Sequence, residues 1–215
     1  MSGMNGQALF AAYKQAAGAG SDLVIPVGQP VEALLRPIAT NSAHINLNDA
    51  RLLSEWRNRF VKSFLTEFDS HETRTANWLA GPVARDPGKI LFMVDTLDGR
   101  AVGHVGLGFI DWDKGYVEAD AIVRGGECRK GLMTLALQAL LHWARVGLGL
   151  PDAWVRVRSD NPAVAFYQKA GFGEVKRVPL SCTSADGQLT WVEDAAAGQD
   201  APALVYMRYQ APAQQ

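Results

Sequence analysis

The 215-residue sequence predicts a mixed α/β fold, in which helices flank a central mixed sheet built from an antiparallel meander followed by a βαβαββ half. The first observation is a series of three β-rich runs, 89–96, 101–110 and 116–123, joined by turns that contain Asp-Gly or Lys-Gly. Such turns are typical of antiparallel neighbours. The second is that helical and strand-like segments alternate after residue 131, which favours crossover connections onto the same sheet.

The first 40 residues look like an extension packed on a domain that spans residues 41–215. A chain of this length with 48% hydrophobic residues can bury a substantial core. The elements expected in the extension are, in order, a helix (7–17), a break at "AGAGSD" (17–22), a short strand (23–27) and a helical or irregular piece (30–38).

Two helices are expected before the meander. A strand at 44–47 leads to Asn48, whose side chain would cap an amphipathic helix. Ser70 would cap a second helix, and the Gly-Pro pair at 81–82 would end it.

The second half begins with a long core helix, because apolar residues recur at helical spacing over 132–145. A strand, a short helix, a strand and a final strand are then expected at 153–159, 162–170, 172–180 and 203–209. A polar, Gly- and Ala-rich excursion through about residue 201 would separate the last two strands.

The short helix has clear boundary signals in "NPAVAFYQKAGFGEV". Asn161 can accept hydrogen bonds from the first turn, Pro162 fits the first helical position, and Gly171 supplies a left-handed stop. We expect Tyr167 to lie beside the core-facing side, with a hydroxyl that needs a partner. The residues expected on that core-facing side are Ala165, Phe166 and the stem of Lys169.

Composition excludes several classes of function. The 21 basic and 22 acidic residues give a net charge of −1, so bulk charge indicates neither nucleic acid nor anionic membrane as a partner. No apolar stretch is long enough to span a bilayer, and the N-terminus lacks a secretory pattern, so we expect a soluble cytoplasmic protein. Cys128 and Cys182 are too few for a disulfide framework or a cysteine-type zinc site, and no metal is implied.

A glycine-rich, basic loop, "RGGECRKG", joins the third run of the meander to the long helix. Free amides and the dipole at such a helix start can bind a pyrophosphate. Lys130-Gly131 is the reverse of the Gly-Lys order in a Walker loop, and the dinucleotide fingerprint is absent. An ordinary glycine turn into a buried helix is the alternative.

The loop, the long helix, the strand and "NPAVAFYQKAGF" together resemble the GNAT superfamily of acyl-coenzyme A-dependent N-acetyltransferases over roughly residues 44–178 and the last strand. The loop departs from the family pattern, with Cys128 in place of Arg or Gln and Met133 in place of Gly or Ala. We therefore expect Arg129 or Lys130 to supply the charge. The matching residues in the helix are Asn161, Ala165, Phe166, Tyr167, Lys169, Gly171 and Phe172.

The resemblance implies a GNAT-like fold with acetyl-coenzyme A as the cofactor. It implies that strand residues Ala121, Ile122 and Val123 hold the pantetheine arm beside the acceptor amine, and that Tyr167 protonates the departing thiolate. Asn161 would add a coenzyme contact to its capping role. The other residues that the resemblance assigns to the coenzyme are Arg129, Lys130, Gly131, Leu132, Met133, Thr134, Phe166 and Lys169.

The general base is open between three side chains. Glu118 and Asp120 lie on one face of their strand because side chains alternate, and His104 lies on the preceding strand. Each is also an ordinary solvated residue of a sheet face, and a water chain is a further alternative. Cys128 has no accompanying His–Asp pair, which favours direct transfer in a ternary complex.

The two helices before the meander resemble those of amino-sugar nucleotide N-acetyltransferases. The acceptor would then be a small primary amine, with a nucleotide-linked amino sugar as the first expectation. Alternatives are a protein N-terminus, as for ribosomal proteins, or a non-catalytic acyl-coenzyme A-binding domain; a homodimer is also possible. The residues expected near the acceptor are Trp56, Arg57, Asn58, His71, Trp78 and His104. Arg57 would pair with a substrate phosphate or form a surface ion pair, and Trp56 or Trp78 would serve in the core.

Overall fold

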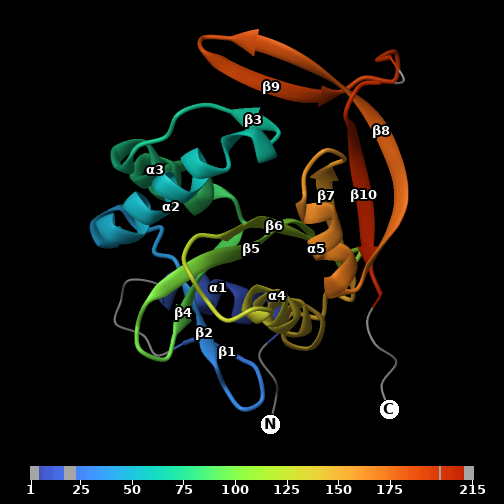
Figure 1. Cartoon of the computed structure of the whole chain (residues 1–215). Coiled ribbons are helices and arrows are strands. Elements are labelled where there is room, and N and C mark those ends of the chain that lie inside the picture. The colour runs from blue at the N-terminus through green and yellow to red at the C-terminus, as the bar shows by residue number, and fades with distance from the viewer. Residues whose placement is uncertain (1–4, 17–22, 199, 211–215) are drawn as a thin grey trace.

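The computed structural model describes residues 5–16, 23–198 and 200–210, and in this part of the chain ten strands form one sheet (Figure 1). The spatial order is β1-β2-β4-β5-β6-β7-β10-β8-β9-β3. Every neighbouring pair is antiparallel except β6 and β7, so the mixed sheet is confirmed. The strands are β1 Ile25–Val27, β2 Ala33–Pro37, β3 Thr66–Glu67, β4 Ile90–Thr96, β5 Ala101–Asp111, β6 Tyr116–Arg124, β7 Asp152–Arg158, β8 Phe172–Ala185, β9 Gln188–Glu193 and β10 Ala203–Tyr209.

Helices cover both faces of the sheet. The α-helices are α1 Gly6–Ala16, α2 Leu47–Arg59, α3 Glu72–Trp78, α4 Leu132–His142 and α5 Ala163–Ala170. Two short 3-10 turns lie at Ser42–His44 and Val61–Ser63, and π-helical turns extend α3 over Leu79–Val83 and α4 over Trp143–Gly147. No helix among the described residues has the length and apolar character needed to cross a bilayer.

Two hydrophobic layers hold these helices on the sheet. The larger packs α1, α4 and α5 against one face, and the smaller packs α2 and α3 against the other. Alternation along β4 shows the division, because Phe92 lies in the larger layer and Met93 in the smaller. In Figure 1 the α2 and α3 helices lie on one side of β5 and β6, and α4 lies on the other.

The parallel pair β6 and β7 separates after a short contact. Only Tyr116–Glu118 pair with Asp152–Trp154, so residues 119–124 leave β6 with an edge that β7 does not occupy. The register with β5 also shifts in this stretch, and Ala121 has φ +50°. A shift in register with a left-handed residue is a β-bulge, which bends the strand and redirects its backbone groups.

The N-terminal region differs from the sequence expectation at 30–38. This segment forms β2, which pairs with β1 and β4, and not a helical or irregular piece. Pairing with β4, distant in sequence, overrides the weak local pattern. The helix expected at 7–17 is confirmed over Gly6–Ala16, while Ala17 and the break at 17–22 lie outside the described residues. The division of the chain into an extension (1–40) and a domain (41–215) stays a prediction.

Two expected helix starts are displaced. Asn46, and not Asn48, caps α2 by accepting a hydrogen bond from the Asp49 amide at 3.2 Å, and no strand forms at 44–47. His71, and not Ser70, caps α3 through its ring nitrogen. That helix also continues through the Gly-Pro pair at 81–82 as a π-helical turn, where the prediction ended it.

The polar excursion expected between the last two strands is largely a β-hairpin. Strand β8 runs to Ala185, turns at Asp186-Gly187 and pairs with β9. Strand β9 in turn pairs with β3, so the hairpin reaches the α2–α3 connection, as Figure 1 shows at the top of the molecule. Both strands of the hairpin are largely exposed and carry polar side chains, so they lack the apolar alternation that predicts a strand.

Candidate active site

The loop that enters α4 has the geometry of an anion cradle. Gly131 adopts φ +91° just before the helix, a conformation that favours glycine, and no atom lies within 4 Å of the position of a Cβ there. The Leu132 amide donates to the Arg129 carbonyl at 3.1 Å, and the following amides of the first turn have no partner inside the helix. Arg129 binds both oxygens of Glu32, at 2.5 and 2.6 Å, whereas Lys130 is exposed and has no ion pair among the described residues. The residues fit the pyrophosphate of coenzyme A.

The remaining residues of this helix start are mostly part of the core. Leu132 and Met133 are buried in the larger hydrophobic layer, and Thr134 is half-buried. Met133 packs against β5, where a Cβ on Gly103 would approach its sulfur to 2.9 Å. Met133 and Thr134 can therefore serve the coenzyme through their backbone amides, whereas the Leu132 amide is engaged with the Arg129 carbonyl and the Leu132 and Met133 side chains are in the core.

The loop is braced from the α2 side by residues that belong to another element. The Trp56 indole packs so closely on Gly125 that a Cβ there would lie 1.9 Å from the ring. The Arg59 guanidinium donates to the Gly125 carbonyl at 2.5 Å. Trp56 is buried and joins α2 to the loop, in agreement with the core role given as one alternative, while its place near the acceptor stays a prediction.

The free edge of β6 includes the three residues expected to hold the pantetheine arm. Ala121 forms the bulge, Ile122 packs toward the larger layer, and Val123 is buried in the smaller one. Their side chains are thus committed to packing, while β7 has diverged from the strand. Backbone groups along such an edge can pair with an extended amide-containing chain.

Tyr167 is 7% exposed and lies in the larger layer. Its ring contacts Phe166 and Phe172 edge-on, with centroids 5.3 and 5.8 Å apart. Burial raises the pKa of the Tyr167 hydroxyl, and the negative charge of Asp120 raises it further. None of the side-chain hydrogen bonds of the described residues involves this hydroxyl, and its oxygen is not among their buried unpartnered atoms, so it is a protonated donor that a ligand can reach.

The face of α5 that meets the core differs from the expected one. Tyr167 and Ala170 are buried, whereas Ala165 and Lys169 are exposed and Phe166 is half-buried. The three residues expected in the core are therefore turned toward solvent or the core margin. Their position leaves Phe166 and Lys169 open to a coenzyme contact, which stays a prediction.

Asn161 has both ends of its amide engaged within the protein. Its oxygen accepts a hydrogen bond from the Ala163 amide at 2.8 Å, as expected, but the helix begins at Ala163, one residue later than predicted, with Pro162 at the cap position. Its nitrogen donates to the Ser63 carbonyl at 3.0 Å, in the α2–α3 connection. Gly171 has the expected left-handed conformation, with φ +107°. The start of α5 is thus tied directly to the acceptor-side segment.

The two acidic candidates for the general base both have partners. Glu118 accepts from the Tyr116 hydroxyl at 2.6 Å and from Arg156 at 2.7 Å, and it is buried. Asp120 forms an ion pair with Lys89 and is half-buried. Because Glu118 is held by two donors, Asp120 is the more accessible carboxylate of the pair.

His104 is buried beneath α2, with its ring stacked on Trp56 at a centroid distance of 6.0 Å. Burial lowers the pKa of His104 to about 4, against smaller opposing effects from a hydrogen bond to the Ala121 backbone and the charge of Asp120. Its Nδ1 has no partner among the described residues. A neutral imidazole in contact with the bulge can position Ala121 but is a poor base at neutral pH.

This burial predicts a loss of stability in acid. Between pH 6.5 and 4 the unfolded chain protonates His104 while the folded chain does not, so the free energy of unfolding falls as pH falls. The full loss is roughly 3 kcal/mol. Urea titrations from pH 7 to 4.5 measure it, with His104→Phe expected to flatten the dependence. The exposed His142→Gln is the control and should leave the slope unchanged; an unaltered slope in His104→Phe would contradict the prediction.

The other predicted acceptor residues mostly support the α2–α3 region. Arg57 donates to Thr66 at 2.6 and 3.1 Å and lies on the rings of Phe64 and Phe68, with its Nε buried and unpartnered among the described residues. Desolvation lowers the pKa of Arg57 to about 10, and the charge of Arg74 adds to this effect. A phosphate contact by Arg57 would have to replace these bonds.

Asn58 and His71 form hydrogen bonds with nearby backbone, whereas Trp78 lies near Lys89, the partner of Asp120. Asn58 forms two hydrogen bonds of 2.8 Å with the Ser70 backbone, and His71 caps α3. The half-buried Trp78 ring lies 5.7 Å from the Lys89 ammonium. The structure thus brings Trp78, Asp120 and His104 toward the β6 bulge and places Arg57, Asn58 and His71 in the α2–α3 framework.

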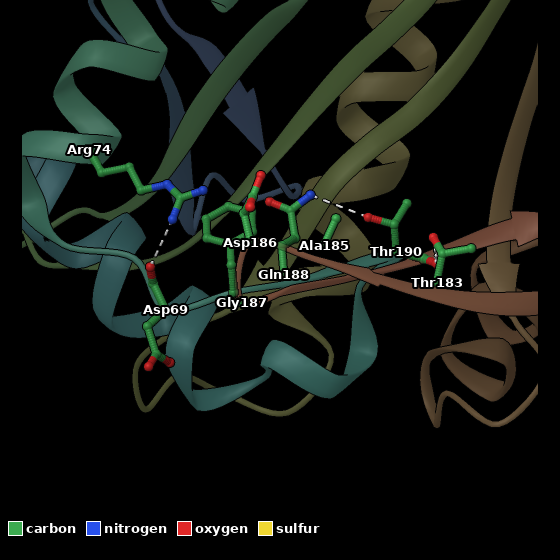
Figure 2. Close-up of a pocket in the computed structure, with 9 residues that line it drawn as sticks. Asp69, Arg74, Thr183, Ala185, Asp186, Gly187, Gln188 and Thr190 are labelled. Atoms are coloured by element: carbon green, nitrogen blue, oxygen red, sulfur yellow. Dashed lines mark hydrogen bonds between the residues drawn. The ribbon is translucent and has the colours of Figure 1, made fainter.

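A pocket of about 520 Å³ lies between the α2–α3 connection and the tip of the β8–β9 hairpin. Figure 2 shows the Arg74 guanidinium donating to the Asp69 carbonyl, with Asp186 and Gln188 on the hairpin beside it. The sequence pattern did not indicate the hairpin side of this pocket, because residues 181–201 were expected to be an irregular excursion. It also missed Lys89 and Arg158, although the alternation of "WVRVRS" placed Arg156 and Arg158 on one strand face.

The divergent parallel strands, the bulge beside a protonated tyrosine and the anion cradle at α4 define a coenzyme A-dependent N-acyltransferase fold. The family model described as "Acetyltransferase (GNAT) family" matches residues 51–172, and the chain belongs to this family. It is therefore a GNAT N-acetyltransferase that uses acetyl-coenzyme A. No curated protein matches the sequence significantly.

Solved structures support the fold. A probable acetyltransferase (GNAT family) from Chromobacterium violaceum is 18% identical, with a TM-score of 0.65 over 90% of this chain and 88% of that one. Spermidine N-acetyltransferase from Vibrio cholerae, solved with CoA and spermine, is 17% identical, with a TM-score of 0.62 over 82% and 94% of the two chains. At these identities the likeness concerns the fold alone.

Proposed function

We propose that the protein transfers an acetyl group directly from acetyl-coenzyme A to the primary amine of a small, positively charged acceptor. The observation that carries this proposal is the position of Asp120, next to the β6 bulge and electrostatically coupled to the Tyr167 hydroxyl. A carboxylate and a phenol close enough to interact electrostatically can supply the base and the acid that amide formation from a thioester requires.

The coenzyme, when bound, supplies an electrophilic thioester carbonyl. Asp120 binds the incoming ammonium and takes its proton, which yields the neutral amine that attacks. Tyr167 donates its Oη proton to the departing sulfur, and the second proton of the attacking nitrogen passes to Tyr167 as the amide forms, which restores the phenol. Burial keeps the phenol protonated at neutral pH. The edge of β6 orients the acetyl group beside the amine, and such positioning contributes several kcal/mol of barrier lowering.

The chemical class of the acceptor follows from the charges on its side of the sheet. Asp120 is the carboxylate next to the β6 bulge, and the separate pocket near the hairpin tip is lined by Asp69 and Asp186, with Arg74 as the cation. Arg57, on which phosphate recognition of a nucleotide-linked amino sugar depends, is committed to Thr66. These contacts favour a cationic amine, and spermine bound to the Vibrio cholerae enzyme is an example of such a compound. A nucleotide-linked amino sugar is the second candidate, and a homodimer remains a prediction.

A panel of amines tests this proposal. The protein would be incubated with acetyl-coenzyme A and one acceptor at a time: polyamines, simple alkylamines, nucleotide-linked amino sugars or a peptide with a free N-terminus. Release of the coenzyme A thiol measures the reaction, and mass spectrometry identifies the acetylated product. We expect acetylated alkylamine or polyamine. Product from the amino sugar alone would restore the sugar hypothesis, product from the peptide alone would indicate N-terminal acetylation, and coenzyme binding without any product would indicate a non-catalytic domain.

A further inference from the structure

Lys89 places a primary ammonium on the carboxylate that the proposed reaction uses. It ends the turn between the α3 region and β4, and its Nζ forms an ion pair with Asp120 Oδ2. The Trp78 ring lies 5.7 Å from the same Nζ, within reach of a cation–π contact. The Lys89 side chain is 19% exposed and the Asp120 side chain 30%, so the ion pair is only partly exposed to solvent.

The surroundings of Asp120 leave this carboxylate open on the acceptor side. It follows directly before the bulge at Ala121, in the part of β6 that β7 does not pair. On the neighbouring strand Gly108 lies under the carboxylate, where a Cβ would approach Oδ2 to 3.2 Å. The charge of Asp120 acts on both Tyr167 and His104, on either side of the strand. No other carboxylate among the described residues is coupled to both groups.

A lysine side chain ends in the same group as an alkylamine acceptor, a primary ammonium on a methylene chain. A carboxylate and an aromatic face that hold one will hold the other, because both interactions depend on the charge and size of the ammonium. A second ammonium on the same carboxylate oxygen would lie close to the first and be repelled by its like charge, so the lysine and the acceptor compete for Asp120.

We propose that Lys89 occupies the acceptor-ammonium site of the free protein and is displaced when an amine binds to Asp120 and Trp78. This inference rests on the proposed function and deepens it, because it names the subsite and a built-in competitor. The competitor weakens the binding of every simple amine equally. Acceptors with further contacts, for example at the α2–α3 connection, overcome it, so Lys89 contributes to specificity.

The experiment measures binding and not turnover. Ligand-observed NMR with n-butylammonium chloride, on protein saturated with coenzyme A, gives the Kd for wild type, Lys89→Met and Asp120→Asn. We expect Lys89→Met to bind about two- to five-fold more tightly, which corresponds to losing one partly exposed ion pair as a competitor. Asp120→Asn should bind roughly ten-fold more weakly or worse, since a charge-assisted hydrogen bond is lost.

Two further variants make the result decisive. Lys114→Met removes the ammonium from a similar Lys–Asp pair with Asp111, in the turn between β5 and β6, and should leave Kd unchanged. Lys89→Arg keeps a cation on Asp120 and should not tighten binding. Equal or weaker binding of n-butylammonium to Lys89→Met than to wild type would overturn the inference. So would the absence of binding to both proteins at about 50 mM n-butylammonium, a concentration at which even a weak site is occupied.

The outcome is separable from that of the proposed function. Acetyl transfer by wild type with no change of Kd in Lys89→Met would leave the function standing and remove the competitor. Tighter binding in Lys89→Met without acetyl transfer to any amine would support the ammonium subsite and remove the catalytic proposal.

Discussion

Tyr167→Phe is expected to lower kcat by about 100-fold or more, which is the usual contribution of a positioned general acid. The phenylalanine keeps the ring contacts with Phe166 and Phe172 and removes only the hydroxyl. Because none of the side-chain hydrogen bonds of the described residues involves that hydroxyl, its loss leaves no buried group without a partner. Stopped assays of thiol release give kcat, and calorimetry gives the Kd for acetyl-coenzyme A, which we expect to remain within about two-fold.

The matched control is Tyr209→Phe. Tyr209 also stacks on Phe172, with centroids 5.3 Å apart, and burial raises its hydroxyl pKa as well, but it belongs to the last strand. It should keep nearly full turnover. An undiminished kcat in Tyr167→Phe would remove the proton-donor role, and an equal loss in both variants would point to packing and not to proton transfer.

The parts of this fold that sequence predicts well are those whose causes are local. The end of α5 follows from one glycine with positive φ, and its start from the Asn161 side chain bonding two residues ahead. The β4–β5–β6 meander likewise follows from alternating runs and short turns. These features need no knowledge of distant partners.

The features that sequence misses depend on partners far away in the chain. Strand β2 exists because β4 lies beside it, and β9 pairs with β3 from the other end of the domain. The same holds in the site: Glu118 carries two donors, one of them Arg156 from β7, while the nearby Asp120 meets a lysine 31 residues earlier. Residue type and strand alternation made the two carboxylates equivalent, and tertiary contacts separate them.

Arg158→Met is expected to destabilise the protein by about 3 kcal/mol, because it removes one partner from a buried ionic network. Arg158 is 6% exposed at the end of β7 and donates to Glu67 at 2.9 Å and to Asp160 at 2.6 and 3.0 Å. The Trp191 ring lies 4.2 Å from its guanidinium and donates from Nε1 to the same Glu67 oxygen. One side chain thus joins β7, β3 and the β8–β9 hairpin.

The loss should be concentrated at the β8–β9 hairpin, because β3 holds its strand partner β9 through only two residue pairs. Urea denaturation measures the global change, and hydrogen exchange of β9 amides tests whether the hairpin opens first. Arg177→Met is the control, since Arg177 forms a similar two-bond pair with Glu174 on the exposed part of β8, where solvent screens the pair, and should change stability little. If Arg158→Met lowers the free energy of unfolding no more than this control, the ionic network does not hold the hairpin in place. If it costs stability but leaves β9 exchange as slow as in wild type, the network supports the core of β7 and the hairpin is held by its strand pairing alone.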